Sequence, residues 1–229
     1  MVSQRLIQNF LKQQLLLYGN ELYLSSSREL DIIDKVENSN LRSDDENLDL
    51  LNKYEKSIST CDECSLNQTR TKFVFGIGDP NADLLLVGEA PGENEDQKGE
   101  PFVGRAGKLL DDILRAINKK RGDGVFITNV LKWRPPNDRD PLPSEIAHCE
   151  LHLGDEIELI QPKLIVALGR IAGKTLLNID SPLEDMRCEI HDYKGTPLII
   201  TYHPAALLRN PDFKSPTWTD FKRIRDYLN

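Results

Sequence analysis

Four short runs of apolar, largely branched residues recur from about residue 50 onward, and segments with helical spacing separate them. The runs cover residues 84–87, 125–127, 164–167 and 198–200. Leucine and isoleucine at steps of three and four mark helices over residues 107–119, 145–160 and 171–177. Strands that alternate with helices are joined by right-handed crossovers, which gives a mostly parallel sheet covered on both faces. The sequence therefore predicts an α/β fold, a three-layer α/β/α sandwich around a central, mostly parallel, four-stranded sheet.

The first 49 residues follow a different pattern. Residues 1–24 have apolar side chains at helical spacing, which predicts an N-terminal amphipathic helix that docks on the core or on a protein partner, or else lies on a membrane surface. Residues 25–49 contain eight acidic and three basic side chains and few large apolar ones, which is typical of a flexible acidic linker. Residues 50–229 then form the predicted folded domain.

The composition excludes several classes of protein. The 229 residues carry a formal net charge of −8, with 29% charged and 39% hydrophobic residues, an ordinary balance for a globular protein. No apolar run approaches the roughly 20 residues that cross a bilayer, and no secretory signal is expected. Four unevenly spaced cysteines do not suit a disulfide scaffold, so we expect a reducing cytoplasm and consider metal binding. The acidic balance argues against a nucleic-acid coat protein but permits a DNA enzyme with a small binding surface.

Polar or glycine-rich loops follow each predicted strand. Glu89 follows the first strand, and Glu95 lies a few residues further on. Asn129 follows the second strand, and His203 follows the last. Ligands bind at the carboxyl ends of the strands in open parallel sheets. We therefore expect these four side chains to converge on one edge of the sheet.

These side chains have complementary chemical capacities. The Asn129 amide offers a donor and an acceptor side by side, which suits an amide-like ring such as a nucleobase. A neutral His203 can donate to a developing oxyanion, and Glu89 or Glu95 can orient water or stabilise a cationic, sugar-like transition state. Phe102 can supply a flat stacking face. The structural alternatives are a turn at His-Pro and a helix cap at Asn129.

The same residues carry a resemblance to a known family. Residues 88–92 (GEAPG) with Glu95 and Asp96, 101–104 (PFVG), Asn129 followed by 134–136 (RPP), and 203–205 (HPA) resemble the iron–sulfur uracil-DNA glycosylases, family four of that superfamily. The resemblance covers about residues 50–229, which would be the uracil-DNA glycosylase domain. It implies a three-layer α/β/α fold and hydrolysis of the N-glycosidic bond of deoxyuridine in DNA.

The resemblance also implies roles for the pocket residues. The first motif lines the pocket and places the water, and its members are Gly88, Glu89, Ala90 and Glu95. Phe102 would stack on uracil, Asn129 would read its polar edge, and His203 would face O2 of the leaving uracil. Which carboxylate stabilises the sugar cation stays open. Ala90 stands where the best-known uracil glycosylases have a water-activating Asp, so no simple general base is assigned.

A loop after the last strand resembles the segment that enters the duplex as the nucleotide leaves the stack. Its DNA-contacting residues would be Pro204, Ala205, Leu207, Leu208 and Arg209. Extrusion of the target base costs a few kcal/mol, which a U·G mismatch lowers. Either Leu207 or Leu208 is the predicted wedge, and Arg209 is a predicted phosphate contact.

The family resemblance implies a 4Fe-4S cluster held by four cysteines. Cys61, Cys64 and Cys149 occupy three of these positions, but Trp133 occupies the fourth. Thiolates are the usual ligands of such clusters, and an indole nitrogen only donates, so Trp133 cannot replace one. Three outcomes stay open. They are a cluster with another fourth ligand (His148 or His152 is near Cys149 in sequence) or with three irons, no cluster with Trp133 filling the space, and rescue by Cys188 or a zinc site.

The sequence thus predicts a cytoplasmic, monomeric uracil-DNA glycosylase acting on single- and double-stranded DNA, with no membrane association and a possible protein partner for residues 1–24. One alternative is a related glycosylase that prefers hypoxanthine, xanthine or mispaired thymine. Another is a non-catalytic or covalently trapping DNA-binding module, which would bind uracil-DNA without releasing uracil.

Overall fold

The structure is a computed structural model that describes residues 44–68 and 71–229. The predicted helix over residues 1–24 and most of the predicted linker lie outside the described residues. Residues 44–229 form one compact unit. No helix in the described residues is long and apolar enough to span a bilayer.

Six strands of the described chain form one sheet in the order β1-β3-β2-β4-β6-β5. Their bounds are β1 Ile77–Gly78, β2 Leu84–Gly88, β3 Val125–Asn129, β4 Leu164–Leu168, β5 Ile190–Tyr193 and β6 Thr196–Thr201. The four central strands are the predicted ones and run parallel, whereas β1 and β5 pair antiparallel at the two edges. The α/β class is therefore confirmed, but the predicted count of four strands is wrong. The edge strands were missed because β1 has only two residues and β5 (IHDY) has little apolar character.

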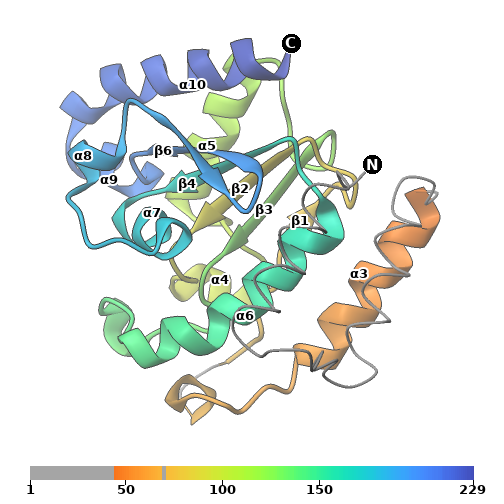
Figure 1. Cartoon of the computed structure of the whole chain (residues 1–229). Coiled ribbons are helices and arrows are strands. Elements are labelled where there is room, and N and C mark those ends of the chain that lie inside the picture. The colour runs from red at the N-terminus through yellow and green to blue at the C-terminus, as the bar shows by residue number, and fades with distance from the viewer. Residues whose placement is uncertain (1–43, 69–70) are drawn as a thin grey trace, which may run out of the picture. The chain divides into compact units, whose positions relative to one another are not determined.

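Helices cover both faces of this sheet (Figure 1). The α-helices are α3 Asp44–Ile58, α4 Glu93–Lys98, α5 Arg105–Ala116, α6 Pro143–Ile160, α7 Arg170–Leu177, α8 Leu183–Met186, α9 Pro204–Arg209 and α10 Lys214–Leu228. Short 3₁₀ turns are η2 Ser65–Gln68, η3 Pro136–Asp138 and η4 Pro211–Phe213. The predicted helical segments correspond to α5, α6 and α7, and the sequence analysis did not predict α10.

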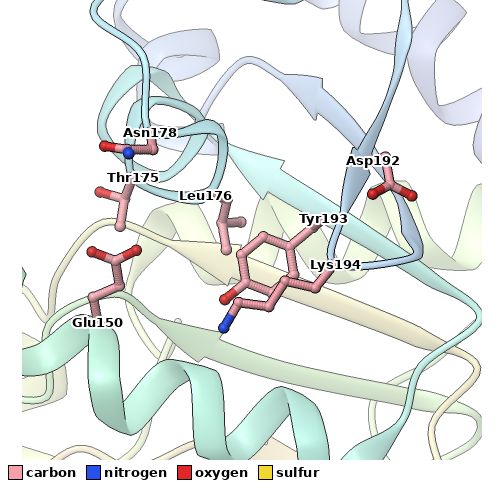
Figure 2. A pocket seen from close by; sticks show the side chains of 7 residues that line it. All are labelled: Glu150, Thr175, Leu176, Asn178, Asp192, Tyr193 and Lys194. Carbon is pink, nitrogen blue, oxygen red and sulfur yellow. The ribbon is translucent and has the colours of Figure 1, made fainter. Parts of the chain in front are cut away.

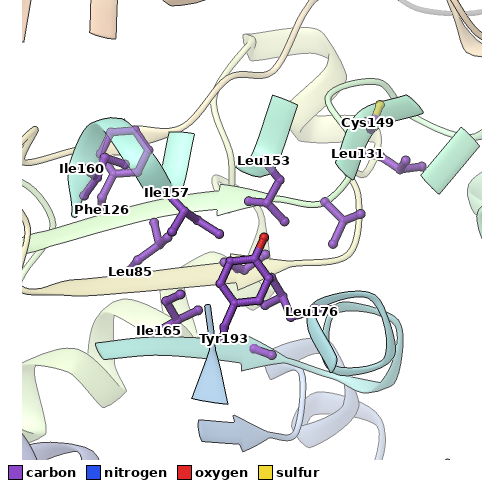
Figure 3. Packing of buried hydrophobic residues seen from close by; sticks show 14 of the residues in the cluster. Leu85, Phe126, Leu131, Cys149, Leu153, Ile157, Ile160, Ile165, Leu176 and Tyr193 are labelled. Atoms are coloured by element: carbon purple, nitrogen blue, oxygen red, sulfur yellow. The ribbon is translucent and has the colours of Figure 1, made fainter. Parts of the chain in front are cut away.

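Two apolar clusters, one on each face of the sheet, confirm the three layers. Alternate strand residues such as Leu85 and Phe126 pack against α3, α6 and α7, where Leu153 and Ile157 of α6 point toward the sheet (Figure 3). The intervening strand residues, such as Leu86, pack against α5 and α10. Because successive strand side chains point to opposite faces, fully apolar strands need a helix layer on each side.

Helix α3 corrects the end of the predicted acidic linker. Residues 44–49 form its first turns. Leu51 and Ile58 of this helix are buried against the α6 side of the core, and Tyr54 packs beside them. Apolar residues at 51, 54 and 58 have the spacing of one helix face. The count of acidic residues concealed this face, although the side chains of Asp45, Glu46 and Asp49 are exposed and do not interrupt it.

The parallel register brings the functional loops together. Gly88 at the end of β2 pairs with Asn129 at the end of β3, and Leu168 at the end of β4 pairs with Thr201 at the end of β6. The four central strands therefore end at one edge of the sheet, and the loops that follow them start there.

Candidate active site

Asn129 ends β3 and is almost fully buried, with 1% of its surface exposed. Its Oδ1 atom has no hydrogen-bond partner among the described residues. A Cβ atom added to the neighbouring Gly88 would lie only 2.3 Å from this oxygen. A buried acceptor without a partner is costly, and most such groups in native proteins are satisfied. Asn129 therefore presents an acceptor that a ligand donor can complete.

The Phe102 ring lies near both Asn129 and His203. A Cβ atom on Gly88 would be 2.6 Å from Cζ of Phe102, so the absence of a side chain at Gly88 makes room for both the ring and the amide. The Phe102 ring stacks on the His203 imidazole, with ring centroids 5.4 Å apart and planes 29° apart. The structure thus brings together the two polar side chains and the aromatic ring that the sequence predicted at one edge.

The loop that carries Phe102 is held in an unusual conformation. Phe102 has a φ of 54°, in the left-handed region, which costs of order 1–3 kcal/mol for such a residue. Oε1 of Glu95 accepts hydrogen bonds from the backbone N–H groups of Val103 (2.8 Å) and Gly104 (2.9 Å). Arg121 donates to the carbonyl oxygen of Phe102 at 2.6 Å. These contacts hold the backbone of residues 102–104 in this strained conformation.

His203 is neutral in this environment. Burial lowers its pKa to about 4, and the charge of Arg209 acts in the same direction. Its Nδ1 accepts a hydrogen bond from the backbone N–H of Ala205 at 3.1 Å. A neutral imidazole has one protonated nitrogen, so an accepting Nδ1 assigns the proton to Nε2. His203 is therefore an uncharged Nε2–H donor at neutral pH.

The two candidate carboxylates have different surroundings. The Glu95 carboxylate accepts hydrogen bonds from the loop that carries Phe102, as described above. Glu89, at the end of β2, is partly buried, and its side chain has no hydrogen bond to the described residues. Burial raises the pKa of Glu89, as does the charge of Asp140, while Arg170 and Arg209 oppose the shift. The two carboxylates therefore differ, because Glu95 is bound to the loop that carries Phe102 whereas the environment of Glu89 is set by burial and by the charges of Asp140, Arg170 and Arg209.

The neighbouring Ala90 packs against the α6 side of the core.

Helix α9 separates the predicted DNA-contacting residues by exposure. Pro204 and Leu207 are buried, with Leu207 only 2% exposed. Leu208 is 41% exposed and Arg209 is also exposed. Of the two leucines, Leu208 is therefore the one with an exposed side chain.

A cavity of about 330 Å³ lies elsewhere, between α6, α7 and the turn that joins β5 to β6 (Figure 2). Its lining residues are Glu150, Thr175, Leu176, Asn178, Asp192, Tyr193 and Lys194. None of the predicted site residues lines it, so it is separate from the edge described above.

Comparison with known proteins agrees with this arrangement. The family model described as the uracil DNA glycosylase superfamily matches residues 75–223, which include every candidate residue at the edge. The chain belongs to the uracil-DNA glycosylase superfamily. It is 44% identical over 187 residues to a type-4 uracil-DNA glycosylase of Sulfurisphaera tokodaii, covering 78% of this chain and 85% of that protein. It is 41% identical over 185 residues to a type-4 uracil-DNA glycosylase of Archaeoglobus fulgidus, covering 77% and 92%.

A more distant relative is a type-5 uracil-DNA glycosylase of Pyrobaculum aerophilum, which is 30% identical over 146 residues, 57% of this chain and 64% of that protein. The higher identity and coverage of the type-4 proteins confirm the resemblance to family four found in the sequence.

Within this glycosylase fold, three of the predicted cluster cysteines lie in one region. Cys149 of α6 is buried, and Cys61 and Cys64 follow α3. Burial raises the pKa of the Cys149 thiol to about 11, and the nearby Cys64 and Cys61 act in the same direction. Nε2 of His152 lies 3.5 Å from Sγ of Cys61. Cys188 is exposed in the connection between α8 and β5.

The donor set does not fit a cluster held by four thiolates. Trp133, in the fourth position, is 3% exposed and belongs to the same apolar cluster as Cys149. Its ring packs on Phe73, with centroids 4.8 Å apart and planes 60° apart. Within residues 44–68 and 71–229, no three His, Cys, Asp or Glu side chains are grouped so that they could hold a metal ion.

Several residues that support the site were missed by sequence reasoning. Arg121 gave no signal because it lies outside every motif, in the loop after α5. Gly169 has a φ of 97°, and a Cβ atom there would be 3.0 Å from Cβ of His203, so this glycine permits the close approach of β4 and the His203 loop. A glycine directly after a predicted strand was the available sign of such a contact.

Proposed function

We propose that this glycosylase hydrolyses the N-glycosidic bond of deoxyuridine in DNA, which releases uracil and leaves an abasic site. The observation that carries the proposal is the buried, partnerless Oδ1 of Asn129 beside the stacked rings of Phe102 and His203. The names of the type-4 relatives support the same substrate.

The Asn129 amide has the pattern that distinguishes uracil from cytosine. Uracil presents an N3–H donor beside the O4 acceptor, and the amide supplies an acceptor and a donor in the matching order. Cytosine presents an acceptor and a donor in the reverse order, so an amide held in the orientation that matches uracil stays unpaired. A site built to form such hydrogen bonds rejects a base that cannot form them. Phe102 supplies the stacking face for the extruded ring.

Bond cleavage leaves negative charge on uracil and positive charge on the sugar. The electron pair of the glycosidic bond moves into the uracil ring and onto O2, where the Nε2–H of neutral His203 donates a hydrogen bond to the developing oxyanion. Glu89 stabilises the positive sugar and orients the water that attacks it. Glu95 acts as a positioning residue, because it holds the loop that carries Phe102.

Uracil release from oligonucleotides tests the function. The purified protein should release uracil from single-stranded and duplex DNA, and should act more slowly on hypoxanthine, xanthine and mispaired thymine in otherwise identical strands. A preference for one of those bases would identify the related glycosylase that we keep as the alternative. Tight binding of uracil-DNA without release of uracil would identify a binding or trapping module.

The exposure of Leu208 gives a prediction about duplex DNA. Leu208→Ala should slow uracil release from duplex DNA about tenfold or more, because a wedge offsets an unstacking cost of a few kcal/mol. Release from single strands should change little, since no stack has to be opened. Single-turnover rates on the two substrates measure this difference. Equal losses of rate on duplex and single-stranded DNA would contradict the role of Leu208 as a wedge. Arg209→Ala, which removes a proposed phosphate contact, is the variant with which Leu208→Ala is compared.

For the cofactor, we propose that Trp133 packed on Phe73 takes the place of the fourth cluster ligand and that the fold is stable without a 4Fe-4S cluster. Three thiols and an indole lack the fourth thiolate that such a cluster uses. Protein reconstituted with iron and sulfide without oxygen should hold no stoichiometric iron and show no visible iron–sulfur absorbance. Trp133→Cys, treated in the same way, should gain iron. Stoichiometric iron in the wild-type protein would refute this proposal.

The four cysteines are unevenly spaced and do not suit a disulfide scaffold, which supports the proposed cytoplasmic location. We also propose that the protein is a monomer. The docking of residues 1–24 on a partner stays a prediction, because those residues lie outside the described part of the chain.

A further inference from the structure

Asn129 and His203 must both hold their positions against the extruded base, and each follows a buried threonine at the end of a strand. Thr128 precedes Asn129 at the end of β3. Thr201 ends β6, two residues before His203. Both threonines are fully buried, and neither has a role in the proposed chemistry.

Beneath Asn129, Thr128 belongs to a buried ionic network. Its hydroxyl donates to Oε2 of Glu156 at 2.9 Å, and the Lys132 ammonium donates to the same carboxylate oxygen at 2.8 Å. Lys132 also donates to the Thr128 hydroxyl at 2.8 Å and to the backbone carbonyl of Asn129 at 2.9 Å. The side chains of Lys132 and Glu156 are both 0% exposed. A buried cation thus holds the backbone of the residue that presents the amide.

Beneath His203, Thr201 belongs to a second network of the same kind. Its hydroxyl donates to Oδ2 of Asp220 at 2.6 Å, and Arg187 donates to this oxygen from Nε (3.1 Å) and Nη2 (2.8 Å). The Arg187 guanidinium also lies over the ring of Tyr202, 4.5 Å from its centroid. Tyr202 directly precedes His203. The network therefore fixes the two residues that lead into the imidazole.

The two networks lie on opposite sides of the sheet. Glu156 comes from α6, which packs on one face, and Asp220 comes from α10, which packs on the other. Each therefore ties the end of one strand to one helix layer. Neither helix supplies a residue to the proposed chemistry itself.

A gain in folding stability does not explain why these two ion pairs, Lys132–Glu156 and Arg187–Asp220, are buried. Apolar residues of similar volume often stabilise a core as well as or better than a buried ion pair. A pair that fixes a single geometry at a strand end has a different use, because small displacements of reacting groups cost large factors in rate.

We propose that these two networks are separate positioning devices, with Lys132, Glu156 and Thr128 orienting Asn129 for uracil recognition and Arg187, Asp220 and Thr201 orienting His203 for bond cleavage. This inference rests on the proposed function. It assigns a role in geometry, not in contact with the substrate, to all six residues.

The test compares Glu156→Gln with Asp220→Asn in the full-length protein. Glu145→Gln is the matched control, since Glu145 is also a buried carboxylate of α6, is 1% exposed and pairs with Arg139 at 2.6 Å, but it is bound to no strand end. The measurements are kcat and KM for uracil release, the inhibition constant of free uracil, and the melting temperature.

Displacement of Asn129 or of His203 should change one kinetic parameter about tenfold, and the parameter should differ between the two residues. Glu156→Gln should raise KM and the uracil inhibition constant with kcat nearly unchanged. Asp220→Asn should lower kcat with the uracil inhibition constant nearly unchanged, and the ring nitrogen signals of His203 in NMR spectra should shift in this variant alone. Glu145→Gln should lower the melting temperature without changing either kinetic parameter.

Milder variants cover the case in which a charge-network variant does not fold. Thr128→Val and Thr201→Val replace only the hydroxyl with a methyl group. Thr128→Ser and Thr201→Ser keep the hydroxyl and should therefore retain the wild-type value of the respective parameter. Changes of kcat and KM that follow the melting temperature in all variants, the control included, would overturn the positioning roles. A wild-type protein that releases no uracil would instead refute the proposed function, and this inference with it.

Discussion

His203→Ala should lower kcat for uracil release by about 10²–10³-fold, the usual loss when one oxyanion donor is removed. The Nε2–H group acts on O2 only as negative charge develops there, so the loss should fall on kcat and leave the inhibition constant of free uracil within a small factor. Single-turnover kinetics on a uracil-containing oligonucleotide measure the first quantity, and inhibition by free uracil measures the second.

The neutral state of His203 makes this prediction sharper. The imidazole stays uncharged until the pH falls toward about 4. Between its folded pKa of about 4 and the ordinary value of 6.5, the unfolded chain binds a proton that the folded chain does not. Protonation of His203 therefore does not affect the free energy of unfolding above pH 6.5, and it lowers this free energy as the pH falls toward 4.

NMR titration of the His203 ring nitrogens should show the Nε2–H tautomer at neutral pH and no protonation near pH 6.5. A charged ring at neutral pH would contradict the proposed role, because a cation would then act as an acid. His191→Ala is a suitable control, since His191 lies on the edge strand β5, where its Nε2 contacts the carbonyl of Met186.

The sequence predicted the parts of the fold that depend on apolar pattern. The four central strands and the helices α5, α6 and α7 follow from runs and spacings that only a doubly covered sheet satisfies. The two edge strands could not be found in this way, because β5 (IHDY) does not alternate between apolar and polar residues, with both Ile190 and Asp192 exposed, and β1 is too short to have a pattern.

The site was predictable as a set of loops but not as a geometry. Parallel strands must end at one edge, which placed Asn129 and His203 near each other before any coordinates were known. Phe102 has a strained φ, and Glu95 accepts hydrogen bonds from backbone N–H groups. Both features depend on contacts between separate segments of the chain. No spacing in the sequence encodes such contacts, so the choice between Glu89 and Glu95 required the structure.

Buried charge was the least predictable feature. Lys132 lies between a strand and the tryptophan of the altered cluster motif, where a lysine is expected to face solvent. Glu156 and Asp220 lie in helices whose apolar spacing gives no reason to expect a buried acid. Each is buried because its partner comes from another element, and pairing across elements becomes visible only in three dimensions.

Asn129→Leu should reduce activity and stabilise the fold at the same time. Leucine has nearly the shape of asparagine but no polar atoms, so the variant loses both hydrogen bonds to uracil. A matched pair of hydrogen bonds to a base is worth about 1–3 kcal/mol, and at 1.36 kcal/mol per tenfold this lowers kcat/KM by roughly 5–150-fold. Because the bonds also form with free uracil, its inhibition constant should rise by a similar factor, in contrast to His203→Ala.

The stabilisation follows from the unpaired oxygen. An unsatisfied buried acceptor costs about 1–3 kcal/mol, and Asn129→Leu removes it. For a chain of this size each kcal/mol changes the melting temperature by about 2–4 °C, so the variant should melt a few degrees higher than the wild type. Thermal unfolding without ligand, followed by unfolding with free uracil, separates the two effects. Uracil should raise the melting temperature of the wild type more than that of Asn129→Leu, and an equal rise in both would show that the amide does not bind the base.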